Sequence, residues 1–425
     1  MISYDQALER LLAHTRRLPG ESRSPVDSLG CVLARDVRSP MDLPSFDHAA
    51  MDGYALSARQ PLAAGSEHLV VGSQAAGDAA RASQGIACEI MTGARLPDGL
   101  DAVVAVERTQ WLARGDDGTP ARIRLLDTLA AGYNVRYAGS DVAKGALVVA
   151  AGTRIEPAHV MLLAALGVTS VEVVRQPRVA IIGTGKELLA DPTQPLADEQ
   201  IHHSNGPYLR AAFAAAGVQV LSCETLDDTA SHYREAVVRA REAGADLIVS
   251  TGAVSMGRYD FVPDTLQTLG AELLFHKVAI RPGKPMLAAM LGDATLVLAL
   301  PGTPMAVAVG FRFFAAPVLR AWAGQGSEAV LHAVLDTPQQ AKPGLRHFLR
   351  ARLGQGSDGR LHASLLKLQQ PFRIQPFAEA GAWVLLGEDA GDCLPGMLVE
   401  IASLHPGGPL SVSTIRDMNC QGTPI

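Results

Sequence analysis

The chain has 425 residues, of which 48% are hydrophobic and 19% charged, so it is long enough to bury several cores in about two to four globular domains. Its formal net charge of -6 argues against nucleic acid as the main partner, because binding phosphates requires a surplus of Lys and Arg. No basic and apolar leader follows Met1 and no long apolar run occurs later, so we expect a cytoplasmic protein that does not span a membrane.

The first predicted element is a helix that begins after Ser3. Ser3 and Gln6 form a capping-box pattern, and Pro19-Gly20 predicts the end of the helix. The apolar residues that recur on one face are Tyr4, Leu8, Leu11 and Leu12. The chain is therefore expected to open with an amphipathic helix.

A mainly β region is predicted from about residue 26 to residue 174, where short apolar runs alternate with Gly, Pro and Asp. The clearest runs are residues 67–72, 86–92, 102–107 and 146–150. One Ala- and Leu-rich segment, residues 157–166, predicts a helix instead. We therefore expect residues 1–176 to form an N-terminal part, with a β subdomain inserted at about residues 46–145.

Residues 177–325 change to an alternation of strands and helices. Strands are predicted at 179–182, 218–222, 246–250, 273–280 and 295–300, and helices at 206–216, 230–243 and 305–322. This alternation is typical of a mainly parallel sheet between two helical layers, in which ligands bind beyond the carboxyl ends of the strands. Further strand-like runs at 329–335, 348–353 and 383–386 predict a small C-terminal β domain over residues 326–425.

Three loops follow predicted strands of the α/β part. They read STGAVSMGRYD (250–260), RPGKP (281–285) and LPGTP (300–304). Gly has no Cβ and Pro fixes its turn, so such loops bring backbone N–H groups and a few charged side chains close to an anion. An oxyanion or phosphate ligand is the first hypothesis.

Cysteines and histidines give no sign of a metal site. The five cysteines stand singly, without the CxxC spacing of zinc sites, and are expected to be packing residues. His202 and His203 are neighbours, so their side chains should point apart, and a loop or surface location is expected for the pair.

Eight segments, in order, carry a resemblance to a known family. They are FDHAAMDGYA (46–55), IMTGARLPDGLDAVV, NVRYAGSD, GTGKEL, SN (204–205), STGAVSMGRYD, HKVAIRPGKP and ALPGTP. Their order and spacing resemble the molybdopterin molybdenumtransferase family, which includes the bacterial MoeA proteins and the gephyrin E domain. The resemblance implies a multidomain α/β plus β fold. Its parts would be a molybdopterin-binding three-layer α/β domain, N-terminal mainly β regions and a small C-terminal β barrel, in an elongated homodimer.

The resemblance also implies a reaction, in which molybdate is inserted into adenylylated molybdopterin and AMP is released. Cleaving a pyrophosphate requires charge neutralisation and a positioned water, commonly through a metal held by carboxylates. Glu187, Asp227 and Asp260 match the family's acidic positions and are the candidate catalytic and metal ligands. Because only oxygen ligands are offered, Mg²⁺ is the expected cofactor.

Molybdate is a tetrahedral dianion, so its site should offer cations, hydroxyls and backbone N–H groups. Lys277, Arg281 and Lys284, at i, i+4 and i+7 around a Pro-Gly turn, match the family's basic positions, as do Ser255 and Arg350. The remaining candidates for substrate binding that the resemblance implies are Ser204, Asn205, Gly252, Gly257, Pro301, Pro304 and Arg136. Asp52, Thr92 and Asp141 are candidate catalytic residues that, in the family, reach the active site of the partner subunit.

Several positions depart from the family pattern. Lys186 stands where an Asp is usual, and Ala253 where a second Gly is usual, which restricts positive φ there. Thr303 replaces an Asn, Ser140 a Glu and Arg281 a Lys. Ala306 and Pro371 each replace a Ser, and losing two neutral hydrogen bonds would weaken molybdate binding about ten- to a hundredfold if nothing compensates.

Two other interpretations stay open at this point. A molybdopterin adenylyltransferase would use the same α/β domain, but that class typically lacks the N-terminal β region. A divergent paralogue that binds or hands over the cofactor without catalysis would account for Ala306 and Pro371. Candidate partners are the adenylyltransferase and acceptor molybdoenzymes. Residue types do not distinguish molybdate from tungstate, because the two oxyanions share charge and nearly share size.

Overall fold

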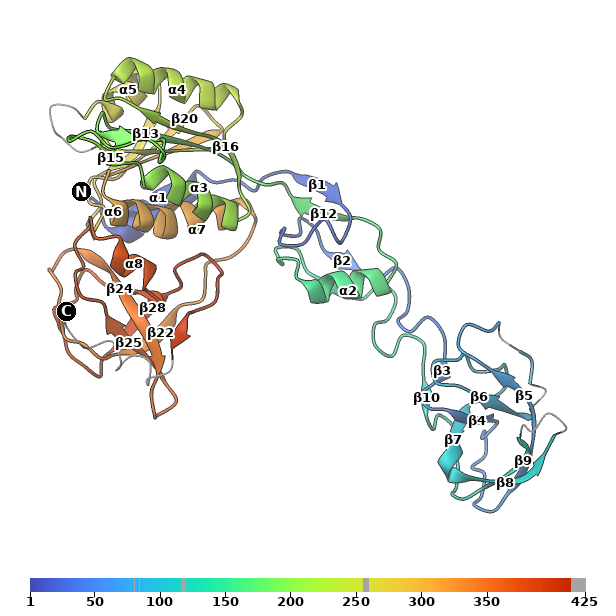
Figure 1. The fold of residues 1–425 in the computed structure, drawn as a ribbon. Helices are drawn as coiled ribbons and strands as arrows, with labels where there is room; N and C mark the ends of the chain where they lie inside the picture. Colours follow the sequence, from blue (N-terminus) through green and yellow to red (C-terminus); the bar gives the residue numbers. More distant parts are fainter. Residues whose placement is uncertain (80, 84, 116–119, 255–259, 414–425) are drawn as a thin grey trace. The chain divides into compact units, whose positions relative to one another are not determined.

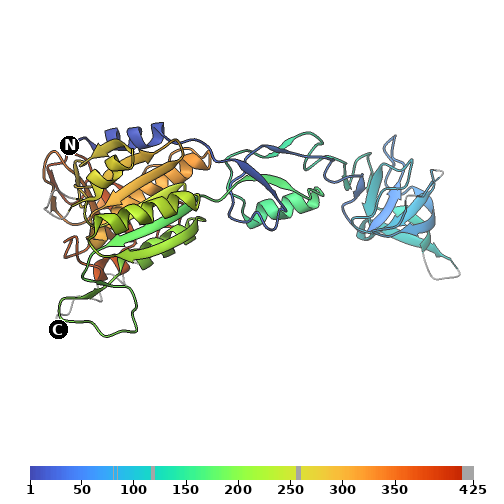
Figure 2. The same ribbon diagram turned by 90° about the horizontal axis from the view of Figure 1, so that it is seen from above.

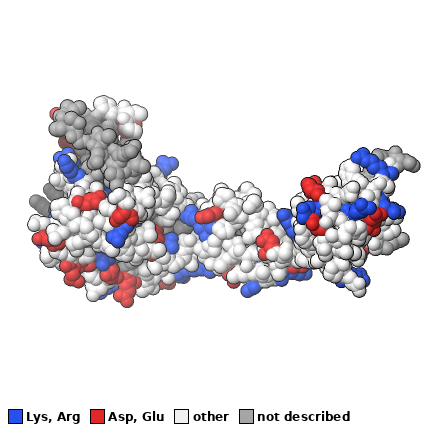
Figure 3. Space-filling view, turned by 90° about the horizontal axis from the view of Figure 1, so that it is seen from below, with Lys and Arg blue, Asp and Glu red and all other residues white. Residues whose placement is uncertain are grey.

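The computed structural model describes residues 1–425 except 80, 84, 116–119, 255–259 and 414–425 (Figure 1). The chain forms two compact units. The N-terminal β unit comprises residues 22–173, and the α/β unit comprises residues 1–21 and 174–425. Figure 3 shows one face of the molecule, on which acidic and basic side chains are interspersed over the described residues of each unit.

The N-terminal β unit is built mainly of short strands, as predicted. One sheet runs in the order β7-β4-β6-β5-β9-β8 and lies within the predicted inserted region. Its strands are β4 Gly53–Leu56, β5 Glu67–Gln74, β6 Ala87–Ile90, β7 Ala102–Ala105, β8 Thr109–Arg114 and β9 Pro120–Leu125. Outside it, β2 (Val37–Arg38) pairs with β11 (Leu147–Val149), and β3 (His48–Ala49) with β10 (Val135–Arg136). Helix α2 spans Pro157–Ala165, where the sequence predicted a helix.

The α/β unit contains a sheet in the order β16-β13-β17-β21-β20-β18. Its strands are β13 Arg178–Thr184, β16 Gln219–Leu226, β17 Leu247–Thr251, β18 Glu272–His276, β20 Leu287–Leu291 and β21 Thr295–Leu300. The first four strands of that order are parallel, and β20 is antiparallel to both of its neighbours. The helices are α3 Asn205–Ala215, α4 Ala230–Glu242, α5 Val262–Thr268, α6 Pro304–Gly310 and α7 Ala316–Trp322. Figures 1 and 2 show α4 and α5 on one face of the sheet and α3, α6 and α7 on the other, which confirms the three-layer prediction.

Two elements of this sheet region differ from expectation. The predicted strand 273–280 ends at His276, because Lys277 takes a φ of 73° and breaks the extended backbone. Ile280–Arg281 instead forms β19, which pairs with β24 of the C-terminal barrel. Strand β20 and helix α5 were not predicted.

Helix α1 spans Tyr4–Ala13 and begins with the predicted capping box. It ends earlier than predicted, because the side chains of His14 and Thr15 hydrogen-bond the carbonyl groups of its last turn. Ala7 and Leu11 are fully buried, and Arg10 donates to the Leu274 carbonyl at 2.9 Å. These contacts explain why residues 1–21 join the α/β unit rather than the N-terminal part in which the sequence placed them.

The C-terminal region forms the predicted barrel. Strands β24 (Arg346–Gln355), β25 (Leu361–Leu365), β22 (Leu331–Leu335), β28 (Leu398–Ala402) and β26 (Ala382–Leu386) pair in that order, and β26 closes on β24. Its buried core includes Ala351, Leu353, Val384 and Ile401.

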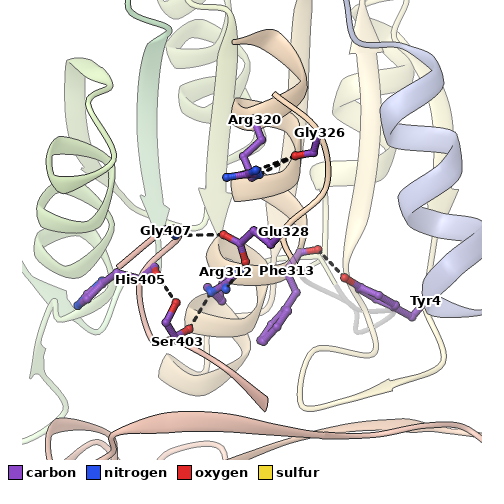
Figure 4. Close-up of polar contacts among 9 residues, drawn as sticks. All are labelled: Tyr4, Arg312, Phe313, Arg320, Gly326, Glu328, Ser403, His405 and Gly407. Atoms are coloured by element: carbon purple, nitrogen blue, oxygen red, sulfur yellow. Dashed lines mark hydrogen bonds and ion pairs between the residues drawn. The ribbon is translucent and has the colours of Figure 1, made fainter. Parts of the chain in front are cut away.

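A buried arginine connects the C-terminal barrel with the helical layer of the α/β unit. A π-helical segment, Phe311–Ala315, connects α6 and α7. From it, Arg312 donates to the Ser403 carbonyl at 2.8 Å and pairs with Glu328, which also accepts from Gly407 N (Figure 4). Tyr4 of α1 donates to the Phe313 carbonyl at 3.2 Å in the same segment. Barrel, helical layer and α1 are therefore one packed body.

The helix running from Pro304 to Trp322 is long and apolar enough to cross a membrane by length and composition alone. Most of it, 83% of the apolar window, is buried inside the protein. Ala306, Val309 and Phe314 are examples, each at most 1% exposed. Such burial is typical of the core helix of a globular domain.

Candidate functional site

The ends of β13 and β17 lie close together at the carboxyl edge of the α/β sheet, and Gly252 makes this close approach possible. Gly252 follows β17 and takes a φ of 97°. A Cβ at this position would lie 2.5 Å from the Thr184 carbonyl oxygen at the end of β13, so only glycine fits. The loops after β13 and β17 are therefore in direct contact.

Asn205 brings the helix start and the LPGTP loop together. It begins α3, is 8% exposed, and donates from Nδ2 to the Gly302 carbonyl at 2.7 Å. Ser204 directly before it is exposed. In the LPGTP loop, Pro301 and Pro304 are half-buried, and a Cβ on Gly302 would lie 3.8 Å from Gly252 Cα. Residues of the SN, STGAVSMGRYD and LPGTP segments thus lie at one edge.

The candidate carboxylates follow strands at this edge. Asp227 comes directly after β16, is exposed, and accepts a bond from His232 Nδ1 at 2.8 Å. That bond is the main cause that holds the pKa of the Asp227 carboxyl below its ordinary value. Glu187 is exposed beyond the end of β13, and Asp260 is half-buried just before α5.

Glu187 and Asp227 belong to neighbouring loops. Gly185 donates its N–H to the Leu226 carbonyl at 3.0 Å, and Lys186 donates its N–H to Asp228 Oδ2 at 3.3 Å. Even so, no group of three or more His, Cys, Asp or Glu among the described residues is placed to hold a metal ion. Glu187, Asp227 and Asp260 therefore do not form a metal cage by themselves.

The basic loop lies at the same edge of the sheet. Strands β18 and β21 run in the same direction, since each pairs antiparallel with β20, so the segment after β18 follows a carboxyl end. Arg281 and Lys284 are exposed on either side of Gly283, whose φ is 111°. Lys277 is half-buried, and Val278 N–H donates to the Lys284 carbonyl at 2.9 Å, which closes the loop.

Arg350 is buried, with only 1% of its surface exposed. Its guanidinium donates to Gln369 Oε1 at 3.2 Å, the Arg373 carbonyl at 2.6 Å and the Leu368 carbonyl at 2.9 Å. These contacts give Arg350 a structural role that the sequence did not reveal, since they fix the loop 366–373. A direct contact with molybdate stays a prediction.

The loop that Arg350 fixes reaches the start of α6. The Pro371 carbonyl accepts the Met305 N–H at 3.0 Å. The Met305 N–H, in the first turn of this helix, is therefore already bonded to a protein carbonyl. Pro371, which departs from the family pattern, supplies that carbonyl group. Ala306, the other departure, is buried next to Met305.

If Arg350 acts by holding this loop, Arg350→Ala is expected to lower the free energy of unfolding by about 3 kcal/mol, because buried carbonyl groups lose charged donors. Urea unfolding of the full chain measures this. Arg352→Ala is the matched control, since Arg352 lies on the same strand but pairs at the surface with Glu379 and should cost about 0–1 kcal/mol. Equal losses for the two variants would contradict the structural role.

Ala253 shows how the chain accommodates one departure. It takes a φ of 48°, a conformation that costs a residue with a Cβ about 1–2 kcal/mol. Packing of Ala253 against the buried core of the unit and the bond from Val262 N–H to its carbonyl at 3.3 Å hold it there. The added methyl therefore does not prevent positive φ. Ser255 and Gly257 in the same loop lie outside the described residues.

The N-terminal β unit holds four further candidates. Asp52 is exposed, and its Oδ1 accepts from Thr92 N at 2.7 Å and Thr92 Oγ1 at 2.8 Å. The backbone bond from Thr92 is the main cause that lowers the pKa of Asp52, so this carboxylate is ionised at neutral pH. Arg136 lies on β10 opposite His48, and Asp141 is exposed with its N–H bonded to the Leu43 carbonyl. The structure thus joins Asp52 and Thr92.

His203 was expected in a loop or at the surface, and it lies in the loop between β15 (Ile201–His202) and α3 but is buried, with 7% exposed. Its Nε2 accepts the Gly206 N–H at 3.0 Å, and its Nδ1 bonds Thr225 Oγ1 at 2.8 Å. The sequence did not reveal this burial, because these contacts come from elements far apart in the chain. One local signal was present, since His203 stands three residues before Gly206 at a helix start, the spacing of a capping side chain.

The chain matches two family descriptions: the MoeA N-terminal region (domain I and II) over residues 2–167, and a probable molybdopterin binding domain over residues 180–321. A molybdopterin molybdenumtransferase of Synechococcus elongatus is 36% identical over 333 residues, which are 76% of this chain and 80% of that protein. One from Bacillus subtilis is 35% identical over 327 residues, 76% of this chain and 75% of that protein.

A solved structure agrees with these relatives. The crystal structure of a molybdopterin biosynthesis MoeA protein from Pyrococcus horikosii matches with a TM-score of 0.81 and 27% identity, over 95% of this chain and 99% of that one. The resemblance inferred from the eight sequence segments is therefore confirmed. This chain belongs to the molybdopterin molybdenumtransferase family.

Proposed function

We propose that this protein inserts molybdate into adenylylated molybdopterin and releases AMP, as a cytoplasmic homodimer. The observation that carries the proposal is the meeting of the GTGKEL, SN, STGAVSMGRYD and LPGTP segments at one sheet edge. Asn205 bonds the Gly302 carbonyl, and Gly252 contacts Thr184. Backbone N–H groups at such an edge suit the phosphates of a nucleotide-linked substrate.

Each group at the edge has a chemical task in this reaction. The carboxylates of Glu187, Asp227 and Asp260 would orient a water against the pyrophosphate and accept its proton. The lowered pKa of Asp227 means that its carboxylate is ionised at neutral pH, so it is available to hold a cation or to accept a hydrogen bond from the attacking water. Ser204 and Asn205, at the start of α3, would position the pterin or its phosphate.

Mg²⁺ is proposed to arrive with the substrate. Since the described carboxylates form no metal cage, the ion would be held by one or two of them together with phosphate oxygens, as is common for Mg²⁺. Its chemistry would be neutralisation of charge on the phosphate oxygens. Glu187 and Asp227, on neighbouring loops, are the ligands we favour.

The molybdate site is proposed at the basic loop. Arg281 and Lys284 are both exposed on a closed turn, so their charges are available to a compact dianion. Lys277, half-buried in the same segment, would add to the positive potential. Arg350 would support the start of α6 by holding the loop 366–373, whose Pro371 carbonyl accepts the Met305 N–H.

Arg281→Ala and Lys284→Ala are each expected to raise the molybdate concentration needed for cofactor formation about tenfold or more, because a charge-assisted hydrogen bond is lost. Affinity for the adenylylated pterin should change little. Cofactor formation at varied molybdate and pterin binding are measured separately, with Arg239→Ala of α4 as a control for loss of a surface cation paired with Glu224. A fall in pterin affinity at unchanged molybdate dependence would move the two cations to the nucleotide.

The homodimer is supported by the surroundings of Asp52. Phe46, Met51 and Met91 are exposed by 39%, 44% and 37%, and two of them adjoin the bonded pair Asp52 and Thr92. Exposed apolar side chains around an ordered carboxylate suit a surface that a second subunit covers. We propose that this second subunit contributes the site that Asp52 serves.

The decisive experiment incubates the purified full-length protein with adenylylated molybdopterin, Mg²⁺ and molybdate. AMP release and cofactor formation are followed separately. The proposal expects both, with cofactor formation dependent on molybdate. Absence of AMP release under conditions where the substrate binds would overturn it and favour a binding protein.

A further inference from the structure

His203 joins three elements beneath the candidate site. Its ring lies between two glycines, since a Cβ on Gly183 of β13 would come within 2.4 Å of its Cε1, and one on Gly206 of α3 within 2.7 Å. Its Nδ1 bonds Thr225 Oγ1 on β16 at 2.8 Å. The imidazole is therefore in contact with β13, α3 and β16 at once.

The hydrogen bonds define the tautomer. Gly206 N–H can only donate, so Nε2, 3.0 Å away, must carry a lone pair. The ring proton is then on Nδ1 and is donated to Thr225 Oγ1. Ser204 occupies the N-cap position of α3 without a side-chain cap bond, so the His203 imidazole takes the place of the usual capping side chain.

The residues next to these contacts belong to the proposed site. Ser204 and Asn205 follow His203 directly, and Asn205 bonds the LPGTP loop. Thr225 lies two residues before Asp227. The hydrogen bonds of the imidazole therefore adjoin the substrate-binding pair at the start of α3 and the end of β16.

We propose that His203 is a positioning residue for the pterin substrate, which holds the start of α3 only while its imidazole is neutral. Protonation of Nε2 would remove the acceptor of the Gly206 N–H and would place a buried positive charge at the positive end of a helix dipole. The proposal deepens the proposed function and rests on it, because Ser204 and Asn205 are assigned to substrate binding there.

The charged surroundings do not oppose this behaviour. β13 places Gly183, which has no side chain, against the ring, and β16 brings the neutral Thr225 and the thiol of Cys223, which lies 3.1 Å from the position of a Cβ on Gly206. Burial raises the pKa of that thiol, so it stays neutral where an imidazole titrates; Arg210 of α3 and Glu224 of β16 act on the thiol with opposite sign. Burial is also the cause that lowers the pKa of His203.

The direction of the pH effect follows from that shift. A lowered native pKa means that the unfolded chain binds the proton more readily than the folded one. The stabilisation by the neutral ring is therefore complete above the ordinary histidine pKa and is lost as the pH falls through the native pKa. The start of α3 should loosen on the acid side.

The test compares wild type, His203→Gln and His203→Ala between about pH 5 and pH 8. The amide oxygen of Gln extends as far from Cβ as Nε2 does, so it can accept the Gly206 N–H, but it does not titrate. We expect the wild-type KM for adenylylated molybdopterin in AMP release to rise about two- to tenfold as the pH falls, from the loss of one backbone hydrogen bond, with kcat little changed. His203→Gln should lack this additional rise, and His203→Ala should show a raised KM at every pH.

A pH-dependent KM in His203→Gln equal to that of wild type would overturn the proposal. Two further measurements do not depend on activity. Nitrogen NMR of labelled histidine should find Nε2 unprotonated at neutral pH, and an Nε2–H tautomer would contradict the geometry. The unfolding midpoint of wild type should fall more steeply with acid than that of His203→Gln. If wild type released no AMP, the proposed function would fail, while these two measurements would still decide the role of the ring.

Discussion

Asp227→Asn is expected to reduce AMP release about a hundredfold or more while the fold stays intact, because the variant lacks the negative charge and the proton acceptor at the end of β16. The carboxylate is exposed at the site edge, and its bond to His232 Nδ1 keeps it ionised at neutral pH. Asn preserves the shape of the side chain and an acceptor for that bond. The loss should therefore appear in catalysis and not in the unfolding midpoint.

Asp191→Asn is the matched control. Asp191 is also an exposed aspartate with a lowered pKa, but its carboxylate is bonded to Thr193 within its own turn. Both variants remove one negative charge from the same unit, so a general effect of charge on substrate attraction would affect them alike. AMP release by Asp227→Asn at the rate of Asp191→Asn would remove Asp227 from the chemistry.

The edge loops could be predicted because their signals are local. Gly252 follows an apolar run and precedes a loop, and its contact with Thr184 shows why no side chain fits there. The start of α3 and the bounds of β21 were similarly clear from periodicity and from the Pro and Gly residues around them. Backbone requirements of this kind depend on the residue type at a single position, so the sequence shows them directly.

The contacts of Arg350 and His203 come from segments that are distant in the sequence. Arg350 is expected to bind an anion, and the structure adds that its guanidinium donates to carbonyl groups around residues 368–373. His203 was expected in a loop or at the surface, and it lies in a loop but is buried, because Gly183 and Thr225 enclose it. The sequence does not show whether a given Arg or His side chain is exposed or buried, because the tertiary packing determines its exposure.

Strand β20 was missed for a related reason. Leu287–Leu291 begins two residues after Pro285 and is only a short apolar run, so its pattern does not separate a strand from a segment of buried helix. Its identity comes from pairing on both sides with β18 and β21. Because of this antiparallel pairing, the basic loop lies at the carboxyl edge of the sheet. The location of Arg281 and Lys284 therefore depends on β20, a strand that was not predicted.

Mixing an Asp52→Ala chain with an Asp260→Ala chain, each inactive alone, is expected to restore up to about a quarter of wild-type AMP release, by counting the sites of a two-fold dimer. Random exchange makes half of the dimers heterodimers, and in each of these one of the two sites regains both carboxylates. The expectation follows from the proposed homodimer, in which Asp52, held by Thr92 and flanked by exposed Met51 and Met91, serves the site of the partner.

Exchange is verified with differently tagged chains, which also allow the heterodimer to be purified and assayed directly. A heterodimer of Asp52→Ala with wild type is the reference, because it should keep one complete site and about half of the activity by the same counting. The purified heterodimer of wild type with an Asp52→Ala, Asp260→Ala double variant has one chain without either carboxylate, so it should keep no complete site if the two residues come from different chains. Activity of that heterodimer, with none in the heterodimer of Asp52→Ala with Asp260→Ala, would place both carboxylates in the site of a single subunit.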